Sequence, residues 1–342
     1  MAYSTIPKSS SYFNTKLWTG TGATNAQTGL GFQPDLTWIK SRSNTYSHTW
    51  TDAIRGYTKH ISSNTSNDEY SSSTEITSFD TDGFTLGTDA GVNNNGSTFV
   101  AWNWKANGSG SANSDGTISS TVSVNTTSGF SIVSYTGNAT SGATIGHGLG
   151  VAPAVVLVKR LNATSDWVMY HKGMGASKFI VLNTTAAEAS SGGIFYNTAP
   201  TASLFYVGDD GATNASGGTY VAYCFAEKTG FSKFGSYTGN GNADGPFIYT
   251  GFKPAWYLWK PYNATDSWNL VDSKRDGYNP DNNRLFPNSN SAEDTQDRVD
   301  LVSNGIKIKT SDGGTNSSSR SYIYMAFGQP IVSTNGDIAT AR

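Results

Sequence analysis

Acidic residues are the side chains of this sequence that come nearest to a catalytic pattern. A glycoside hydrolase needs two carboxyl groups about 5–10 Å apart, one protonated and one ionised. The candidates are Asp35, Asp52, Glu69 and Asp82. A later segment with the same landmarks has Ala154 in place of Asp35 and His171 near the place of Asp52. Because nothing separates these acids from ordinary surface carboxylates, the sequence does not predict a catalytic pair.

Histidine, cysteine and glycine motifs do not predict a metal, phosphate or nucleophile site either. Asp80-Thr81-Asp82-Gly83 begins like a calcium loop but lacks the acidic residue that closes one, so a turn is favoured. Gly146-His147-Gly148-Leu149-Gly150 lacks the Lys-Ser/Thr ending of a phosphate loop, and no Gly-x-Ser-x-Gly elbow occurs. No metal-ligand spacing relates the histidines His48, His60, His147 and His171.

We therefore assign no catalytic, cofactor-binding or metal-ligating residue and no cofactor, and we expect that the chain is not an enzyme. Residues that bind a substrate or ligand are left open. Cys224, the one cysteine, lies in an apolar run and is expected to be a buried small hydrophobe. Without a second cysteine the chain cannot rely on an intrachain disulfide, which is compatible with synthesis in a reducing cytoplasm.

The composition predicts a folded, β-rich protein. Only 36% of the residues are hydrophobic and 14% are charged, which alone would suit a disordered chain. However, 9 Trp, 18 Tyr and 16 Phe stand in short runs between Gly, Ser, Thr and Asn. Short aromatic and β-branched runs separated by small turn-forming residues are typical of strands joined by tight turns.

The charge pattern excludes several partner classes. The formal net charge is −2 and no basic cluster occurs, so a nucleic-acid footprint is not expected. No apolar stretch has the length of a membrane-spanning helix, and the first eleven residues lack the apolar core of a secretory signal. We expect neither nucleic-acid binding nor membrane insertion.

Four landmarks recur three times in the same order, which predicts three divergent copies of one unit. A proline is followed six positions later by a lysine, at Pro34/Lys40, Pro153/Lys159 and Pro254/Lys260. The other landmarks are a Thr-Gly turn (Thr19-Gly20, Thr136-Gly137, Thr238-Gly239), a tryptophan (Trp50, Trp167, Trp268) and a closing aromatic run (99–104, 220–225, 322–327). The spacing between the proline and the closing run changes by two residues from the first copy to the second and by one from the second to the third.

The predicted fold is all-β, with three tandem β-sandwich units of jelly-roll type at residues 1–106, 107–228 and 229–342. The segments 78–86 and 302–308 are predicted hairpins with Asp-Gly and Asn-Gly turns. In the first closing run, alternation places Phe99, Ala101 and Asn103 on one face and Val100, Trp102 and Trp104 on the other. We expect Trp38, Val156 and Tyr257, which follow the repeat prolines, to lie in the cores of their units.

Two connectors differ in length. Residues 106–128 are rich in Gly, Ser, Asn and Thr, which suits a flexible linker, although 117–124 alternates and could add a strand. Residues 227–235 form a short junction, so units two and three are expected to pack as a rigid pair, with unit one joined less tightly. The tail 329–342 is too polar to fold alone, so we expect another surface to hold it.

The tryptophans admit two interpretations. Aromatic faces stack on sugar rings, so these residues could line a glycan site. Most of them fall at repeat landmarks, however, which favours packing in the core: Trp38, Trp50, Trp102, Trp104, Trp167 and Trp268.

At the landmarks above, the chain resembles a family of repeat proteins encoded by marine bacteriophages. The matching segments are 12–17, 31–40, 51–56, 82–87, 100–105, 146–153 and 220–226. This resemblance covers nearly the whole chain. It implies a virion structural protein, of a kind often found as the distal region of tail-fibre-like proteins, and it brings no catalytic residues.

The expected function is that of a non-enzymatic protein on the phage particle. Because Met1 stands just before the first unit, we expect a compact tail appendage, an adhesin or a capsid-decorating protein rather than a long fibre. The expected partners are further copies of the chain, as a trimer or higher homo-oligomer, capsid or tail proteins, and host surface glycans. The alternative is a tailspike-type depolymerase that degrades such a glycan.

Overall fold

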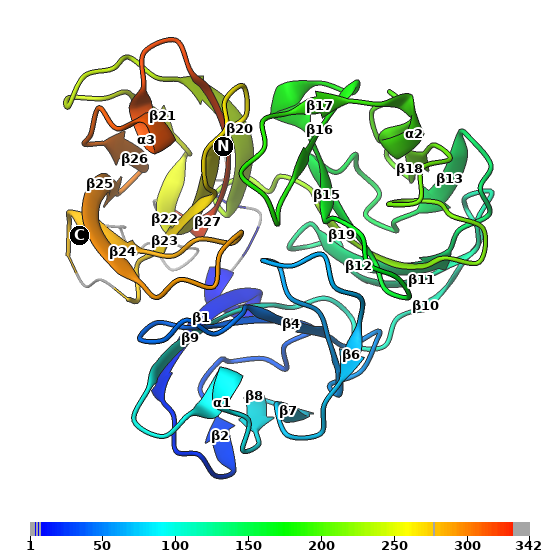
Figure 1. Cartoon of the computed structure of the whole chain (residues 1–342), viewed down its shortest axis with the longest axis horizontal. Helices are drawn as coiled ribbons and strands as arrows, with labels where there is room; N and C mark the ends of the chain where they lie inside the picture. The colour runs from blue at the N-terminus through cyan, green and yellow to red at the C-terminus, as the bar shows by residue number, and fades with distance from the viewer. Residues whose placement is uncertain (1–3, 5, 7, 276–277, 331–342) are drawn as a thin grey trace.

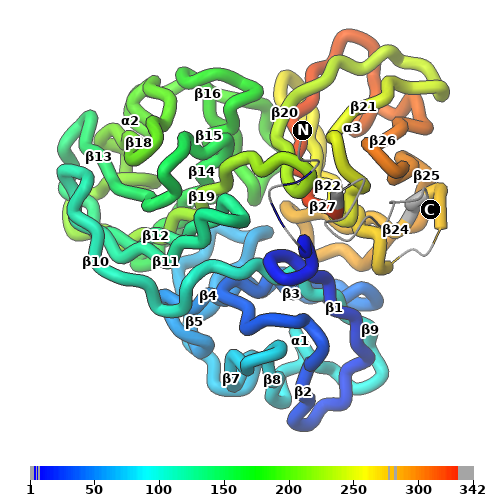
Figure 2. Tube along the Cα trace, turned by 180° about the vertical axis from the view of Figure 1, so that it is seen from behind, coloured from blue at the N-terminus to red at the C-terminus, as the bar shows by residue number. Residues whose placement is uncertain are grey.

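The computed structural model describes residues 4, 6, 8–275 and 278–330 of the chain. It confirms the all-β prediction, because antiparallel sheets make up nearly all the regular structure and each helix has three or four residues. The strands form three sheet groups, which follow one another along the chain and surround a common centre (Figures 1 and 2). We call them the first (13–104), second (111–225) and third (232–330) sheet group.

Each group contains an inner sheet with one strand order. In the first group, β1 (Phe13–Thr19), β9 (Thr98–Trp104), β3 (Leu36–Ser41) and β4 (Thr49–Asp52) are neighbours in that order. The same order in the second group is β12 (Phe130–Thr136), β19 (Thr219–Phe225), β14 (Val155–Arg160) and β15 (Val168–His171). In the third group it is β20 (Ser232–Thr238), β27 (Ser321–Pro330), β22 (Phe252–Pro261) and β23 (Asn269–Asp272).

Smaller outer sheets complete the groups. They are β2 (Asn25–Gln27), β8 (Gly83–Leu86) and β7 (Ile76–Asp80) in the first group, β13 (Ala143–Gly146) and β18 (Leu204–Val207) in the second, and β21 (Phe247–Tyr249), β26 (Gly305–Ile308), β25 (Asp294–Val302) and β24 (Asp281–Arg284) in the third. Outside these sheets and the extensions of the second inner sheet described below lie η1 (Ser9–Ser11), β5 (Lys59–His60), β6 (Tyr70–Ser71), α1 (Ala90–Asn93), η2 (Lys172–Met174), α2 (Gly192–Phe195) and α3 (Gly313–Asn316). Both predicted hairpins are present, as β7–β8 and β25–β26.

The two faces of each inner sheet bury different sets of side chains. One face packs on the outer sheet of its own group, as Phe99 and Ala101 do in the first group. The other face, with Val100, Trp102 and Trp104, packs against the inner sheets of the other two groups. We call this second set the shared cluster; its buried aromatic members are Phe13, Trp38, Trp50, Trp102, Trp104, Phe130, Trp167, Tyr223, Phe225, Phe231, Phe234, Trp256, Trp268 and Phe327. The alternation predicted for the closing run is therefore correct.

The first group is not loosely joined, contrary to our expectation. Its connector forms β10 (Ser111–Asn113) and β11 (Ser120–Asn125), which extend the inner sheet of the second group next to β12. Asp35 accepts hydrogen bonds from the backbone N–H groups of Ala106 and Gly108 at 2.6 and 2.9 Å and so fixes the start of the connector. At its other edge the second inner sheet continues through β16 (Lys178–Val181) and β17 (Ala189–Ser190).

Two residue assignments need correction. Trp38, Val156 and Tyr257 are all buried as expected, but Trp38 belongs to the shared cluster instead of the core of its own unit. Trp50 does not correspond to Trp167 and Trp268. The residue in that position is His48, because the backbone N–H groups of His48, Trp167 and Trp268 each donate to an asparagine at 2.8 Å (Asn64, Asn183 and Asn288).

A repeated Asp-x-x-x-Asn element was missed by our sequence analysis. Each asparagine side chain is buried; its Oδ1 accepts from the backbone N–H that follows the Thr-Gly turn and its Nδ2 donates to nearby carbonyls. The pairs are Asp89/Asn93, Asp210/Asn214 and Asp312/Asn316. The division of the chain into three repeated copies stays an interpretation, which these matching contacts support. Of the tail, Gln329 and Pro330 pair with β22, and residues 331–342 lie outside the described residues.

We predict that Trp104→Ala lowers the free energy of unfolding by about 3–5 kcal/mol, the usual cost of truncating a buried aromatic side chain. The Trp104 ring contacts Phe13, Phe130, Phe225, Trp256 and Phe327, so the cavity would open where all three groups meet. Urea denaturation followed by circular dichroism measures the change. Tyr57→Ala, at an exposed aromatic, is the control; equal effects of the two substitutions would contradict the assignment.

Candidate functional site

Three aromatic side chains at corresponding positions meet at the centre of the molecule. Trp104, Phe225 and Phe327 end the equivalent stretches of β9, β19 and β27, opposite Leu36, Val155 and Trp256. Their ring centroids are 6.2, 5.7 and 5.8 Å apart, in edge-to-face contacts. Each ring is at most 3% exposed, so this centre is a packed core and not a ligand site.

Backbone hydrogen bonds close the ring of groups around this centre. Glu69 of the first group donates its N–H to Leu161 of the second at 2.8 Å. Two matching bonds run from Glu188 to Tyr262 and from Glu293 to Arg42, at 2.6 and 2.8 Å. The bond from Glu188 to Tyr262 joins the second group to the third, and the bond from Glu293 to Arg42 joins the third group to the first. The same type of backbone hydrogen bond, donated by a glutamate, therefore occurs at all three junctions.

The candidate acid Asp52 is part of a junction. It is fully buried at the end of β4 and accepts a 2.8 Å hydrogen bond from the Tyr223 hydroxyl of the second group. Asp272, at the end of β23, likewise accepts from Trp102 Nε1 of the first group at 2.9 Å. At the remaining junction, His171 at the end of β15 forms a hydrogen bond between its Nε2 and the Tyr324 carbonyl of the third group. The expected correspondence of His171 with Asp52 is correct.

Two carboxylates at each of two junctions share one arginine. Arg55 pairs with Asp52 at 2.6 Å and with Glu69 at 3.2 Å. Arg275 pairs in the same way with Asp272 and Glu293. Burial alone would raise the pKa of Asp272, but the charge and hydrogen bonds of Arg275 outweigh it and lower that pKa. An ionised Asp272 that is bound by arginine supplies no proton, so this pairing suits structure better than acid catalysis.

Buried histidines at the junctions are neutral. Trp38 Nε1 donates to His48 Nδ1 at 2.8 Å, so Nε2 carries the proton and donates to the Phe286 and Ser289 carbonyls of the third group. Burial, followed by the charge of Lys40, lowers the pKa of His48 to about 3. Burial likewise lowers the pKa of His171 to about 4.

The lysines that follow the repeat prolines are also buried at junctions. Lys159 Nζ donates to the carbonyls of Ser66 in the first group and Ser165 in its own, at 3.2 and 2.8 Å. Lys260 Nζ similarly donates to Thr185 of the second group at 3.0 Å. Lys40 bonds the carbonyls of Ser41 and Asn44 within the first group. Burial lowers the pKa of all three ammonium groups to about 8.

The other sequence candidates have local roles. Burial raises the pKa of Asp35, whose carboxylate binds the connector. Asp82 is exposed and accepts from the N–H groups of Gly31 and Gly29, which lower its pKa. His147 accepts from the Leu149 N–H, and Cys224 is buried, which raises the pKa of its thiol to about 12. Asp35, Asp52 and Asp82 therefore each bind a different part of the chain, and Glu69 joins Asp52 only through Arg55.

A buried carboxyl that the sequence gave no reason to single out lies in the first group. Glu75 is 5% exposed, lies 3.8 Å from His60 Nδ1 and accepts from the Tyr70 hydroxyl at 3.3 Å. Burial, then the nearby charge of Asp89, raises the pKa of Glu75 to about 7. A carboxyl of that kind can act as an acid, but Glu75 is not among the described residues that line the hollows between and within the groups discussed below.

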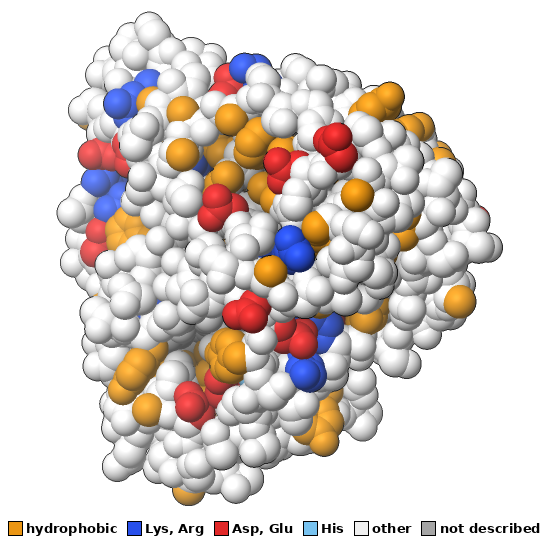
Figure 3. Space-filling view, turned by 45° about the vertical axis from the view of Figure 1, so that its right-hand side comes forward, with side chains coloured by type: hydrophobic (Ala, Val, Ile, Leu, Met, Phe, Trp, Pro, Cys, Tyr) orange, Lys and Arg blue, Asp and Glu red, His pale blue; other side chains and the backbone are white. Residues whose placement is uncertain are grey.

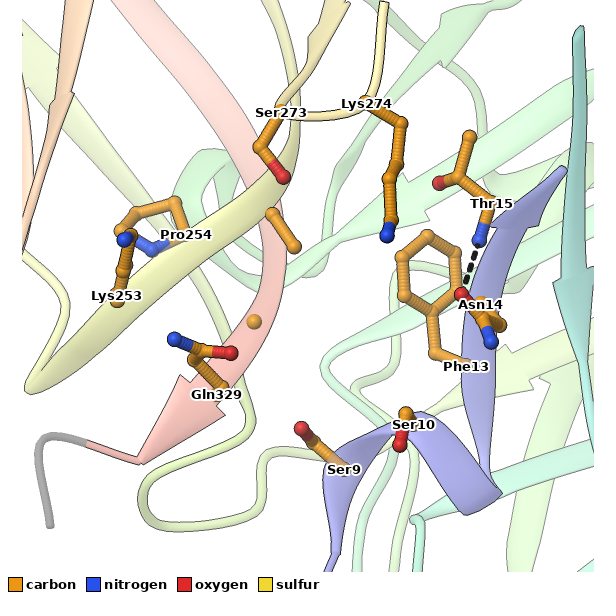
Figure 4. Close-up of a pocket in the computed structure, with 12 residues that line it drawn as sticks. Ser9, Ser10, Phe13, Asn14, Thr15, Lys253, Pro254, Ser273, Lys274 and Gln329 are labelled. Atoms are coloured by element: carbon orange, nitrogen blue, oxygen red, sulfur yellow. Dashed lines mark hydrogen bonds between the residues drawn. The ribbon is translucent and has the colours of Figure 1, made fainter. Parts of the chain in front are cut away.

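An open hollow of about 580 Å³ lies between the first and third groups (Figure 4). Its wall on the first group includes η1 and the start of β1, with Phe13. Its wall on the third group includes the bend of β22 at Pro254 and the loop after β23, with Lys274. A hollow of this size suits a small molecule. Among the described residues, no set of three or more His, Cys, Asp or Glu side chains could hold a metal ion.

Comparison with known families gives one match, over residues 8–330, to a family described as a domain of unknown function (DUF7483). The chain belongs to this family. The match runs through all three sheet groups. No curated protein and no solved structure matches the chain. In the described part of this family member, no helix has the length and hydropathy to cross a lipid bilayer.

We predict that Tyr223→Phe lowers the free energy of unfolding by about 1–2 kcal/mol, because buried Asp52 loses one hydrogen-bond donor. Urea denaturation at neutral pH gives the difference. Tyr249→Phe is the matched control, since the Tyr249 side chain is exposed. If Tyr223→Phe changes stability no more than Tyr249→Phe, the contact between the groups does not stabilise the fold.

The pH dependence of stability follows from His48. An unfolded histidine has a pKa of about 6.5. Below that pH the unfolded chain therefore binds a proton at this histidine that the folded chain does not bind. The contribution of His48 to stability is therefore complete above the unfolded pKa and falls as the pH drops from about 6.5 toward about 3, by roughly 2 kcal/mol at pH 5.

The substitution His48→Gln tests this by urea denaturation at pH 7 and pH 5. It should lower stability at pH 7 and reduce the difference between the two pH values. Trp167→Phe is the control, because it removes the corresponding junction hydrogen bond, from Trp167 Nε1 to Ser62, without removing a titrating group. An unchanged pH difference in His48→Gln would show that His48 is not held neutral.

Proposed function

We propose that the protein is a non-enzymatic structural and recognition protein on the surface of a bacteriophage particle. The observation that supports this most is the use of its chemically capable side chains at the junctions between sheet groups. Asp52, Asp272, His171 and Lys159 each bond a residue of another group. Side chains that form these hydrogen bonds hold the three groups in a fixed arrangement. A protein exposed on the surface of a particle needs such rigidity.

The molecular surface is compatible with a role in recognition. On the face shown in Figure 3, acidic and basic side chains are scattered over a largely uncharged polar surface, with small hydrophobic areas between them. Such a surface can contact sugars or proteins through hydrogen bonds to its many Ser, Thr and Asn side chains. The resemblance to repeat proteins of marine phages adds the expected location on the virion, as a tail appendage, an adhesin or a capsid decoration.

Assembly with further copies, and with capsid or tail proteins, remains part of the proposal. Because the three groups cover one another's inner faces, further copies would have to join through outer surfaces. One such surface is β21, an edge strand whose Phe247 and Tyr249 side chains are 48% and 56% exposed. Light scattering of the purified chain decides this point: a trimer or larger species supports the homo-oligomer, and a monomer at all concentrations contradicts it.

Immunogold labelling of phage particles tests the location. Antibodies raised against the purified chain should label intact particles at one site, the tail tip for an adhesin or the head for a decorating protein. Antibodies from non-immunised animals are the control. Particles that carry no label, while the chain is detected in the surrounding lysate, would contradict a virion protein.

A second assay tests the absence of catalysis. The purified chain is incubated with surface polysaccharide of the host, and new reducing ends are measured. We expect no release above that of buffer. Release that is lost in Glu75→Gln would support the depolymerase alternative and contradict the proposed function.

A further inference from the structure

The hollow between the first and third groups has the chemistry of an anion site. Lys253 and Lys274 line it, and no Asp or Glu is present among the described residues of its wall. Lys274 brings one positive charge to this part of the wall. Lys274 is exposed and extends into the hollow toward the Phe13 ring (Figure 4). A charge-assisted hydrogen bond from this ammonium group would favour an anionic ligand over a neutral one.

The rest of the wall suits a sugar. Ser9, Ser10, Ser273 and Gln329 contribute hydroxyl and amide groups, which can exchange hydrogen bonds with ring hydroxyls. Phe13 and Pro254 form apolar parts of the wall, and both are buried against the rest of the fold. A cavity of about 580 Å³ is much larger than an inorganic anion needs and has the volume of a small organic ligand.

A second hollow provides an internal comparison. It has a volume of about 390 Å³ and occupies the corresponding place in the second group, at Pro153 and after β15 and β19. There, Lys172 pairs with Glu227 at 2.6 Å. The position of Glu227 is taken in the third group by Gln329, two residues after the corresponding Phe327. The hollow that contains Lys274 therefore has the neutral amide of Gln329 at the position where the second hollow has the carboxylate that pairs with Lys172.

We propose that the hollow lined by Phe13, Lys253 and Lys274 binds an acidic sugar unit, carrying a carboxylate or a sulfate group, of a surface polysaccharide. This deepens the proposed recognition function and rests on it. Lys274 bonds the anionic group, and the serine hydroxyls and Gln329 bond the ring hydroxyls. Carboxylated and sulfated sugars share this chemistry, and the test below separates them.

Isothermal titration calorimetry with the full chain tests the proposal. The probes are a tetragalacturonate, a sulfated galactose tetramer, the neutral galactose tetramer and inorganic sulfate. At least one acidic tetramer should bind about tenfold more tightly than the neutral one, the effect of one charge-assisted hydrogen bond. The acidic probe that binds more tightly identifies the anionic group. Equal binding of the neutral tetramer, or binding of inorganic sulfate as tight as that of the acidic tetramers, would overturn the proposal.

Variants locate the binding. Lys274→Ala should weaken binding of the acidic tetramer about tenfold, and Lys274→Arg, which keeps the charge, should retain most of it. Lys172→Ala, in the second hollow, is the matched control and should leave binding unchanged. Since Lys274 is exposed, its variants should melt within a degree or two of the parent, which circular dichroism checks. Undiminished binding by folded Lys274→Ala, or an equal loss in Lys172→Ala, would place the ligand elsewhere and refute the site.

The two proposals can fail separately. If labelling places the chain on phage particles but neither acidic tetramer binds, the virion function stands and the sugar site is refuted. If an acidic tetramer binds through Lys274 but no particle is labelled, the site stands as a sugar-binding site and the virion function is refuted.

Discussion

The burial of the inner sheet faces against one another is the constraint on which the rest of the structure depends. Each inner sheet has apolar side chains on both faces, and its own outer sheet covers only one of them. The uncovered faces meet at Trp104, Phe225 and Phe327. A single group would expose these large side chains to water, which costs about 25 cal/mol for each Å² of apolar surface. The three groups therefore stabilise one another.

Closure around this centre places polar groups where water cannot reach them, and each needs a partner. The ends of β4, β15 and β23 provide Asp52, His171 and Asp272, which bond across the three junctions. The buried lysine of each group satisfies its ammonium with backbone carbonyls, with no carboxylate among them, and its pKa falls accordingly. Asp52 and His171, which the sequence offered as candidate catalytic or metal-binding residues, thus hold together the groups that form the surface hollows.

Local sequence patterns predicted much of the fold because they depend on neighbours along the chain. The Asp-Gly turn identified the β7–β8 hairpin, and strict alternation identified the two faces of β9. Contacts between groups could not be predicted in this way. Asp52 and Tyr223 are 171 positions apart, and no local pattern relates them. The correspondence of His48 with Trp167 was missed because the match was sought by residue type, whereas spacing from the repeat lysine gives it.

In the candidate site, too, the sequence indicated single positions but not the contacts between groups. Sequence identified Asp35, Asp52 and the repeat lysines as noteworthy positions, and the structure places all of them in contacts that hold the chain together. Lys274 carried no sequence signal, because its significance depends on a wall shared by two groups. One difference between the two hollows, Gln329 in place of Glu227, becomes visible only when the strands are aligned by register.

Native-state hydrogen exchange at increasing concentrations of denaturant is the measurement that tests the central claim most directly. If the three groups form one body around the shared cluster, the buried amides of β9, β19 and β27 should exchange through a single opening with the free energy of global unfolding. Exchange from one of these strands at a clearly lower free energy, while the other two stay protected, would show that its group folds and opens independently, which contradicts a mutually stabilised ring.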